Sequence, residues 1–417
     1  MVATYLATLR RTSRDGRLYL LTSGLMGFAF WGGIAAVLAN LYLLRLGYGS
    51  EFIGIYNACG GLGYAAFALP AGALGRRWGS RRTMILGLAT ASIFGMLVPL
   101  AESGPTSLRE GWLLISNLCL SAGFSLYSVN GAPFLMAATG PEERNHAFSV
   151  SSALGPLSAF VGSLIAGLLP GFFAGLLGVG LTHPAPYRYP LFIAAAMLIP
   201  AVLAIFSSHP SGEKRMEQMV GGIGKAPLGV MALLALSVAL RTPAESTART
   251  FFNVYLDAGL QEPTSLIGML TAAGQLMSVP MALMAPLLMA KFGIGRTYAL
   301  ASLGAAASLL PLALVPHWGA AGVGFMGVMG SVSLSFPCMN VFAMLVTPRP
   351  WRSTTSSVVA LANGVGFIGV ALGGGYLIRA AGFPSLFLIS SGLAIVATAV
   401  FWSSFRTPRG ELAPAGV

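Results

Sequence analysis

Residues 72–82 read GALGRRWGSRR and place four arginines at the junction of two apolar runs. The runs lie near residues 51–75 and 83–101. A helix rises 1.5 Å per residue, so an apolar run of about 20 residues crosses a hydrocarbon core of about 30 Å. Glycine permits a tight turn, and arginine binds anionic lipid headgroups. The stretch therefore predicts two membrane-spanning helices joined by a basic turn.

The rest of the chain has the same character. Of 417 residues, 55% are hydrophobic and 9% are charged, against about 25% charged in an ordinary soluble chain. The 54 glycines suit membrane helices, where small residues let backbones approach closely. We expect an all-α integral membrane protein with twelve transmembrane helices. They lie near residues 18–44, 51–75, 83–101, 111–138, 148–181, 188–207, 227–257, 263–290, 297–316, 319–346, 353–378 and 383–404.

The chain divides into two similar halves. The longest polar interruption, HPSGEKRMEQMVGGIGKA at 209–226, predicts a cytoplasmic linker between six-helix bundles at 1–208 and 227–417. A long-period repeat, typical of many transporter folds, supports this division. Three matches carry it: Asn40-Leu-Tyr42-Leu43 with Asn253-Val-Tyr255-Leu256; Gly54, Gly79 and Arg82 with Gly268, Gly293 and Arg296; and Ser125-Leu126, Phe134, Met136 and Thr139 with Ser333-Leu334, Phe342, Met344 and Thr347.

The basic residues indicate how the chain is oriented. Of 24 Lys and Arg residues, 18 fall on the side that holds both termini, 4 on the other side and 2 within a span. This asymmetry predicts a multi-pass protein of the cytoplasmic (inner) membrane with both termini in the cytoplasm. It also explains the net charge of +12, so we expect no nucleic-acid partner. The outer side holds Arg45, Arg109, Arg188 and Arg379, together with the acids Glu51, Glu102, Glu110, Asp257 and Glu262.

The turn at 72–82 resembles the signature loop of the major facilitator superfamily, G-x-x-x-D-R-x-G-R-R. A weaker copy, PLLMAKFGIGR, occupies residues 286–296. The resemblance implies two pseudo-symmetric six-helix bundles and secondary transport, with these loops acting in the conformational cycle. Arg76 and Ala290 stand where the family has an acid that latches helix ends, so the alternative is a role in topology and anchoring alone. The loop residues concerned are Gly72, Arg76, Arg77, Gly79, Arg82, Lys291, Gly293 and Arg296.

The fifth span carries Gly155-Pro156 followed by Gly162 and Gly167. This looks like a partial version of the glycine-proline motif of antiporters in the same superfamily. A proline in a membrane helix is usually a kink repaired by its neighbours. We therefore favour a packing role for these residues over evidence of antiport.

The seventh span is apolar from Leu228 to Leu256 except for a row of polar residues spaced four apart: Arg241, Glu245, Arg249 and Asn253. Residues at this spacing share one side of a helix. A charge near the bilayer centre costs about 2.5 to 3.5 kcal/mol even on lenient scales, so such residues normally face a cavity. The row is our candidate site for substrate binding or coupling. The alternative is a self-neutralising ladder that stiffens a helix interrupted by Pro243.

The charges of this row indicate a class of substrate. Arginine outnumbers acid, and guanidinium pairs bidentately with carboxylate or phosphate, so an anionic or zwitterionic solute is favoured. Glu245 is the one acid expected in the core of a span, so proton coupling through a midplane acid would have to use it. Further polar residues that could line a cavity, each more often an interhelical hydrogen bond than a ligand contact, are Asn40, Asn57, Tyr64, Tyr127, Asn130, Asn340 and Asn363.

No cofactor or metal is expected. The three cysteines lie in separate spans, and the four histidines are scattered at span ends. Gly364-Val-Gly366-Phe-Ile-Gly369 matches G-x-G-x-x-G but lies in an apolar span with no preceding strand. The sequence also lacks an ATP-binding G-x-x-x-x-G-K-[ST] loop.

The function predicted from these features is secondary active transport of a small organic solute by alternating access, with rocking of the two bundles around a site at their interface. The chain is not expected to be an enzyme. A broad-specificity efflux pump for drugs or metabolites is one alternative. A non-transporting membrane protein, either an embedded lipid enzyme or a transporter-like sensor, is the alternative of another class. We expect a monomer whose partners are the substrate, membrane lipids and, with Glu245 as the coupling group, protons.

Overall fold

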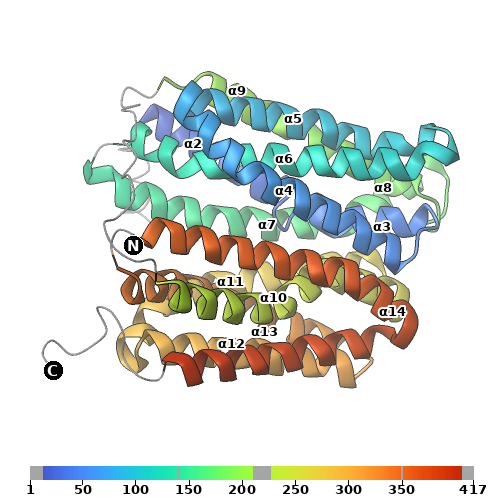
Figure 1. The fold of residues 1–417 in the computed structure, drawn as a ribbon. Helices are drawn as coiled ribbons and strands as arrows, with labels where there is room; N and C mark the ends of the chain where they lie inside the picture. The colour runs from blue at the N-terminus through green and yellow to red at the C-terminus, as the bar shows by residue number, and fades with distance from the viewer. Residues whose placement is uncertain (1–12, 140, 210–226, 349–350, 406–417) are drawn as a thin grey trace, which may run out of the picture. The chain divides into compact units, whose positions relative to one another are not determined.

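The computed structural model describes residues 13–139, 141–209, 227–348 and 351–405. Within these ranges the regular elements are all helices (Figure 1). Eleven helical stretches there are long and apolar enough to cross a membrane. The last of them, Thr354–Phe405, bends at Gly382, whose φ of 78° is outside the helical range. Because the bend divides this stretch into two, the expected twelve spans are confirmed.

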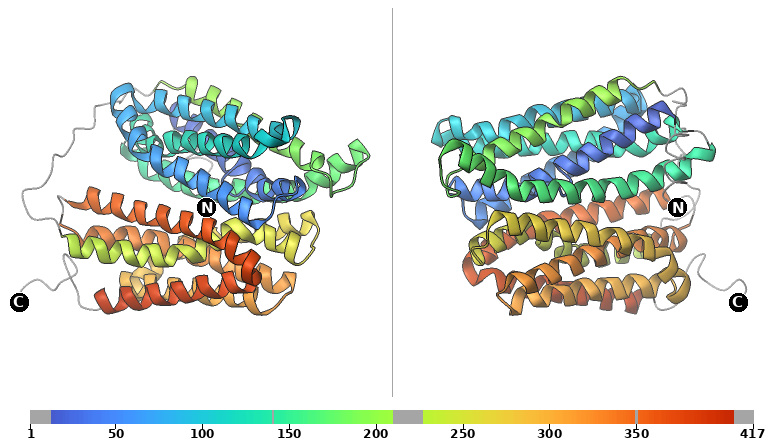
Figure 2. Two further views of the ribbon diagram at one scale, coloured as in Figure 1. Left: turned by 45° about the vertical axis from the view of Figure 1, so that its right-hand side comes forward. Right: turned by 180° about the vertical axis from the view of Figure 1, so that it is seen from behind.

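The helices form two compact units, each a bundle of helices running side by side (Figures 1 and 2). Unit 1 comprises Met1–Tyr48, Cys59–Glu217 and Pro263–Ala272, and unit 2 comprises Gly49–Ala58, Gln218–Glu262 and Ala273–Val417. Two short segments depart from a simple division into halves, because Gly49–Ala58 belongs to unit 2 and Pro263–Ala272 belongs to unit 1. Most of the expected linker, residues 210–226, lies outside the described residues, so the expected boundaries at 1–208, 209–226 and 227–417 stay a prediction.

Unit 1 is built on the packing of α2 against α7 and of α5 against α6. Small residues permit the first contact: a Cβ on Gly27 would lie 2.4 Å from the Gly155 carbonyl oxygen, and one on Gly162 would lie 2.2 Å from that of Phe28. Gly27 and Gly162 therefore act in helix packing, whereas a Cβ on Gly155 would meet nothing within 4 Å. The elements along this part of the chain, of which α4 belongs to unit 1 from Cys59 onward, are α2 Arg14–Ala29, α3 Ile34–Arg45, α4 Ser50–Trp78, α5 Ser80–Leu100, η1 Ala101–Ser103, α6 Thr106–Ala138, α7 Pro141–Leu177, α8 Ala185–Ala196 and α9 Leu198–Phe206.

The first span is broken, which corrects the expectation of one uninterrupted helix over 18–44. Helix α2 ends at Ala29 and α3 begins at Ile34. Gly32 has a φ of 96°, and a Cβ on Gly33 would lie 1.8 Å from the Phe28 carbonyl oxygen. The Ser163 hydroxyl of α7 donates to the Gly32 carbonyl oxygen and so satisfies part of the freed backbone. The glycine pair allows a backbone that residues with side chains could not adopt here.

Unit 2 packs α10 against α14, and α12 against α13 and α14. One of its core clusters includes Leu234, Tyr298, Phe342 and Phe401. A short π-helical turn, η2, extends α10 so that the span runs from Leu228 to Gly259. The elements along this part of the chain, of which α11 belongs to unit 2 from Ala273 onward, are α10 Leu228–Val254, η2 Tyr255–Gly259, α11 Thr264–Phe292, α12 Ile294–Leu314, α13 Trp318–Val346 and α14 Arg352–Phe405.

The two signature-like turns have the same backbone geometry. Gly79 between α4 and α5 has φ 89° and ψ 149°, and Gly293 between α11 and α12 has φ 81° and ψ 153°. Four residues after each glycine, a threonine donates its hydroxyl to the glycine carbonyl oxygen: Thr83 at 3.0 Å and Thr297 at 2.8 Å. Glycine is required at both turns because a positive φ strains other residues. The repeat read from the sequence therefore extends to the conformation of the turns.

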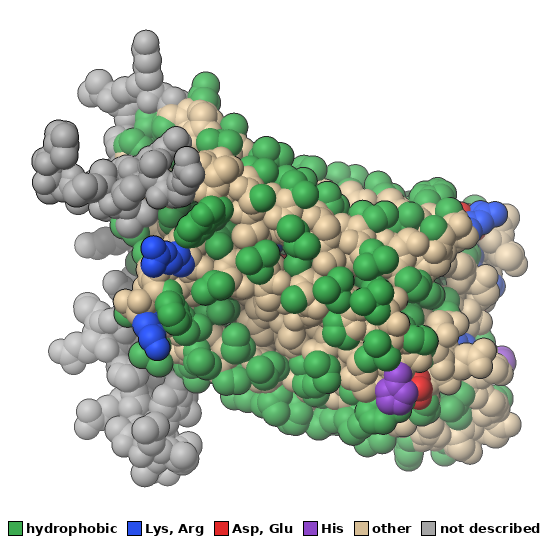
Figure 3. All heavy atoms as spheres, turned by 90° about the horizontal axis from the view of Figure 1, so that it is seen from below, with side chains coloured by type: hydrophobic (Ala, Val, Ile, Leu, Met, Phe, Trp, Pro, Cys, Tyr) green, Lys and Arg blue, Asp and Glu red, His purple; other side chains and the backbone are tan. Residues whose placement is uncertain are grey.

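Charged side chains gather near the ends of the helices. On the face shown in Figure 3, Lys and Arg lie near one end, a mixture of acidic, basic and His side chains lies near the other, and hydrophobic side chains cover most of the length between. This distribution is what a hydrocarbon slab requires of a protein surface. Of the basic residues expected on the inner side, Arg10, Arg11, Lys214, Arg215, Lys225, Arg349, Arg406 and Arg409 lie outside the described residues.

Candidate functional site

The charged row lies on α10 of unit 2 and begins at the middle of that helix. Arg241, Glu245 and Arg249 follow one another at the four-residue spacing that puts side chains on one side of a helix. The structure confirms that they touch: Glu245 Oε2 lies 3.5 Å from Arg241 Nη2, and Glu245 Oε1 lies 2.9 Å from Arg249 Nε. One carboxylate is thus shared by two guanidinium groups. The triad carries one positive charge in excess.

Arg241 is the buried member of the triad. The residue is 5% exposed, and its Nη1 donates to the Ser335 hydroxyl of α13 at 2.8 Å. Its Nε is buried and has no hydrogen-bond partner among the described residues. A buried guanidinium needs both a counter-charge and acceptors, and Glu245 and Ser335 provide them. Arg241 is therefore held from two helices.

Arg249 is the accessible member. Its side chain is 43% exposed, against 22% for Glu245. Only its Nε binds Glu245, and its two Nη atoms donate no hydrogen bond to the part of the chain that the structure describes. A guanidinium in this state presents a planar pair of donors that matches a carboxylate or phosphate. The triad thus combines a fixed cation, a shared acid and an accessible cation.

Neighbouring polar residues fasten α10 to α14. Pro243 lacks an N–H, which frees the Ala239 carbonyl oxygen from the helical pattern. A Cβ on Gly366 would lie 2.9 Å from that oxygen, so glycine lets α14 approach at this point. The Thr242 hydroxyl oxygen lies 2.8 Å from both Val238 O and Asn363 Oδ1, and its single proton is donated to one of them at a time. The glycines of the G-x-G-x-x-G stretch therefore include one that serves helix packing.

The asparagines of the row and its repeat are buried. Asn253 on α10 and its counterpart Asn40 on α3 are each 6% exposed. Asn130 on α6 is 3% exposed and donates to Ala71 O at 3.1 Å and to Leu126 O at 2.9 Å. Asn130 therefore holds α4 and α6 together, whichever further role it has.

Tyr127 and Asn340 differ sharply from each other. Tyr127 on α6 is 2% exposed, and its hydroxyl has no hydrogen-bond partner among the described residues. Asn340 on α13 is exposed, and none of the described contacts joins it to the triad. The remaining polar residues make helix contacts: Asn57 donates to Ile53 O at 2.8 Å, and Tyr64 is hydrogen-bonded to Ser128 at 2.6 Å. The ligand roles expected for these residues stay predictions.

The loop arginines are exposed, and one neighbour ties unit 1 together. Arg76, Arg77 and Arg82 are exposed, as are Lys291, Gly293 and Arg296 in the second turn, whereas Gly72 and Gly79 are partly buried. Arg81 donates to the carbonyl oxygens of Ile205 and Phe206 at the end of α9. A cation at the end of a helix is favoured by the helix dipole. This contact fastens the α4–α5 turn to α9 without an acid in the loop.

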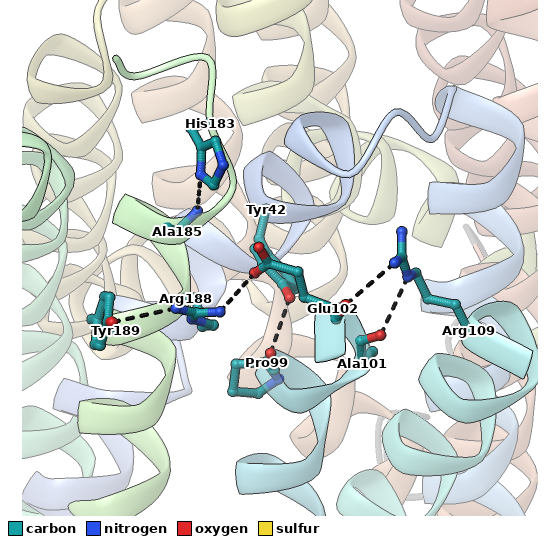
Figure 4. Close-up of polar contacts among 9 residues, drawn as sticks. All are labelled: Tyr42, Pro99, Ala101, Glu102, Arg109, His183, Ala185, Arg188 and Tyr189. Carbon is teal, nitrogen blue, oxygen red and sulfur yellow. Dashed lines mark hydrogen bonds and ion pairs between the residues drawn. The ribbon is translucent and has the colours of Figure 1, made fainter. Parts of the chain in front are cut away.

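A separate polar network lies at the other end of unit 1 (Figure 4). Glu102 accepts from Arg188 Nη1 at 3.2 Å, and its backbone carbonyl oxygen accepts from Arg109 Nη2 at 3.3 Å. Tyr42 donates to Pro99 O at 3.1 Å in the same region. These charges cap helix ends and lie apart from the spans' cores. No group of three or more metal-ligating side chains occurs in the described ranges.

The sequence did not predict two features of the structure, the contact of Ser335 with Arg241 and the break in the first span. Ser335 and Tyr127 occupy matching positions in the repeat, with the same difference in residue number as the pair Ser125 and Ser333. This match could have shown that Ser335, like Tyr127, faces the first span of its unit. The break at Phe30–Gly33 was marked only by the pair Gly32-Gly33, because its other residues are apolar. Neither feature carries a charge that would draw attention to it.

Comparisons with known proteins agree with this architecture. The family model described as Major Facilitator Superfamily matches residues 20–367. A curated relative, the major facilitator superfamily multidrug transporter mfsC of Aspergillus fumigatus, is 31% identical over 153 residues, which cover 35% of this chain and 28% of that protein. The chain thus matches less than a third of that relative's length.

Solved structures share the fold. A nucleoside transporter, NupG, superposes with a TM-score of 0.74 at 15% identity, over 94% of this chain and 100% of that chain. A POT family transporter in complex with 5-aminolevulinic acid gives 0.73 at 14% identity, over 94% and 96%. A D-xylose-proton symporter gives 0.72 at 14% identity, over 96% and 98%. Since the family model covers most of the chain and the fold is that of membrane transporters rather than enzymes, this multi-pass membrane protein belongs to the major facilitator superfamily.

Proposed function

We propose that the chain is a secondary transporter of a small anionic or zwitterionic organic solute, which binds at the Arg241–Glu245–Arg249 triad. The observation that supports this most is the accessible Arg249 beside a shared acid. A charge deep in a span is retained where it meets a substrate or an ion. Alternating access between the two sides of the membrane is the corresponding mechanism.

The triad supports a division of roles. Arg241 is buried and bound to Ser335, so it acts as a positioning residue that orients Glu245. Arg249 has free Nη donors, so it is the residue proposed to contact a carboxylate of the solute. Such a contact is bidentate and charge-assisted, and it is stronger away from bulk water.

Glu245 is the proposed coupling group. It is the one acid in the core of the described spans, because the other acids lie near helix ends. A proton on Glu245 would weaken its bond to Arg249 and leave the guanidinium for the solute. Proton and anion would then bind together, and the gradient would set the direction of transport.

Broad-specificity efflux is a second candidate. The matching Aspergillus fumigatus relative is named as a multidrug transporter, over the limited stretch given above. Efflux of lipophilic cations would not use an excess of arginine. The two candidates therefore differ in the charge of the transported compound.

Flux in proteoliposomes tests the proposal. The probes are radiolabelled benzoate, alanine and tetraphenylphosphonium, each with and without a pH gradient. We expect gradient-driven flux of the acid or the zwitterion, and a loss of roughly tenfold in Arg249→Gln, the size of one lost charge-assisted bond. Arg188→Gln is the matched control, since it removes another arginine paired with an acid, at a helix end.

Three outcomes would contradict the proposal. Flux of tetraphenylphosphonium alone would favour cation efflux. Equal flux in Arg249→Gln and the wild type would remove the triad as the binding site. Undiminished gradient-driven flux in Glu245→Gln would remove Glu245 as the coupling group.

A further inference from the structure

Arg241 has a third neighbour besides Glu245 and Ser335. The Tyr298 hydroxyl of α12 lies within reach of a weak hydrogen bond to the Arg241 guanidinium. Tyr298 is 2% exposed, and its hydroxyl makes no hydrogen bond of ordinary geometry to the described residues. The Nε of Arg241 is also buried and unmatched there. A buried donor and a hydroxyl that can accept from it thus lie in one small region of unit 2 without being joined.

Tyr298 is held in place by the packing of its ring. The ring contacts that of Phe401 at a centroid distance of 4.6 Å and belongs to a core cluster with Leu234 and Phe342. Four residues further along α12, the Ser302 hydroxyl adjoins the Tyr298 hydroxyl and is likewise buried without a hydrogen-bond partner among the described residues. Buried polar groups are nearly always hydrogen-bonded, so these unmatched groups beside the triad call for an explanation.

The proposed coupling step changes what Arg241 needs. In the structure Glu245 pairs with Arg241 and Arg249, as a carboxylate does. When Glu245 takes up a proton, the buried Arg241 guanidinium keeps its charge but loses its counter-charge, and an uncompensated buried charge is strongly destabilising. Ser335 already supplies one acceptor. A further acceptor near Arg241 would therefore lower the cost of protonating Glu245.

The other groups around the triad leave this place to Tyr298. The charges that act on Glu245 are those of the two arginines on its own helix, and no other ionisable side chain described on α12, α13, α14 or η2, which pack against α10, acts on it. Near Arg241, α13 brings Cys338 beside Tyr298, and α14 brings the neutral Asn363 to the next residue of α10. A thiol accepts hydrogen bonds only weakly. Tyr298 is thus the oxygen acceptor at hand.

We propose that Tyr298 is a positioning residue that accepts the Nε–H of Arg241 when Glu245 is protonated. The inference rests on the proposed function, in which Glu245 is the coupling group, and it deepens that function by naming a residue that eases its protonation. Arg241 keeps its charge throughout, while Tyr298 stays neutral and can in turn donate to Ser302. The guanidinium exchanges an ion pair on its own helix for a hydrogen bond to α12, which communicates the state of Glu245 to a second helix.

A double-mutant cycle on the purified full-length protein tests this exchange without any solute. Glu245→Gln puts a neutral side chain of the same shape in place of the carboxylate and so stands for its protonated form. Tyr298→Phe keeps the ring and removes the hydroxyl. We expect Tyr298→Phe to change the apparent melting temperature by less than about 1 °C in the wild type, where the hydroxyl is unmatched. In Glu245→Gln the same substitution should lower it by roughly 2 to 4 °C, because a hydrogen bond to a charged group is lost.

Two controls make the cycle specific. Tyr127→Phe removes another buried hydroxyl that has no hydrogen-bond partner among the described residues, from α6 of unit 1, and should have the same effect in both backgrounds. When Arg241→Met is combined with Glu245→Gln, Tyr298→Phe should cost no more than in the wild type, because the guanidinium is gone. Equal costs of Tyr298→Phe in the wild type and in Glu245→Gln would overturn the proposal, as would an added cost that persists without Arg241.

Flux of radiolabelled benzoate in proteoliposomes separates a positioning role from a purely structural one. Gradient-driven flux requires Glu245 to gain and lose a proton, whereas benzoate exchange at equal pH on both sides does not. We expect Tyr298→Phe to lower gradient-driven flux roughly fivefold and to leave exchange within about twofold of the wild type. A parallel loss of both would make Tyr298 a packing residue and sink the proposal. If the wild type moves no benzoate, the proposed function loses its acid substrate, and the melting cycle still decides for or against Tyr298.

Discussion

The first spans of the two units hold equivalent places in the repeat and differ at their centres. The match of Asn40 with Asn253 places Gly32 opposite Glu245 and Phe30 opposite Pro243. In unit 1 the helix stops and restarts at this level, whereas α10 continues through its proline. One span exposes an aromatic side chain there, and the other carries a charged triad of which Arg249 is the accessible member. Duplication has therefore kept the framework while the centres have become chemically different.

The cause of this difference lies in the neighbours as well as in the spans. Pro243 removes one helical hydrogen bond, and Thr242 and the close approach of Gly366 support α10 at that point. In unit 1, Gly32 and Gly33 allow the chain to leave the helix, and Ser163 binds the freed Gly32 carbonyl oxygen. The helix therefore continues through Pro243 in α10, where neighbouring residues support it, but it ends before Gly32 and Gly33 in unit 1.

The largest expected effect breaks the unit 1 side of this comparison. In Gly33→Ala, the added Cβ would meet the Phe28 carbonyl oxygen at 1.8 Å, and backbone cannot move aside as a flexible side chain can. We expect a loss of about 3 kcal/mol in the free energy of unfolding, at the upper end for overpacking. A lower apparent melting temperature of the purified protein measures it. Gly171→Ala, whose Cβ meets nothing within 4 Å, is the control, and equal melting temperatures for the two variants would contradict the account.

A smaller effect is expected from removing the buried cation of unit 2. Arg241→Met deletes the bonds to Ser335 and Glu245 and leaves Glu245 paired with Arg249 alone. We expect a loss of about 2 kcal/mol in stability, because charged hydrogen bonds are lost but no unpaired charge remains. Thermal unfolding measures it. Phe28→Met, at the equivalent position of unit 1, should cost less than about 1.5 kcal/mol, and the reverse order would refute the positioning role of Arg241.

The smallest effects compare two asparagines on the equivalent helices α6 and α13. Asn130→Ala loses hydrogen bonds to Ala71 and Leu126 in the core of unit 1, which should cost about 1 to 2 kcal/mol. Asn340 is exposed, so Asn340→Ala should change stability by less than about 0.5 kcal/mol. Unfolding of both variants under the same conditions tests this. A larger loss in Asn340→Ala than in Asn130→Ala would show that exposure does not separate their roles.

Some elements of the site were predictable because they depend on one helix alone. The four-residue spacing of Arg241, Glu245 and Arg249 requires a shared side of α10, and the ion pairs follow from that. Likewise, Gly79 and Gly293 were identified as turn residues from their place between apolar runs. The break at Phe30–Gly33 was not predicted, since an apolar broken helix and an apolar continuous one have the same hydropathy.

By itself the sequence determined that this protein lies in a membrane, roughly where its spans lie along the chain, and that its two halves repeat. These properties depend on local hydropathy and on the cost of burying charge, both of which are written along the chain. The tertiary structure alone decided that Ser335 receives Arg241, that Asn130 is buried while Asn340 is exposed, and that Trp31 meets Tyr127. Helical periodicity specifies which side of a helix a residue occupies, but the neighbour across that side is set by the packing of the whole bundle.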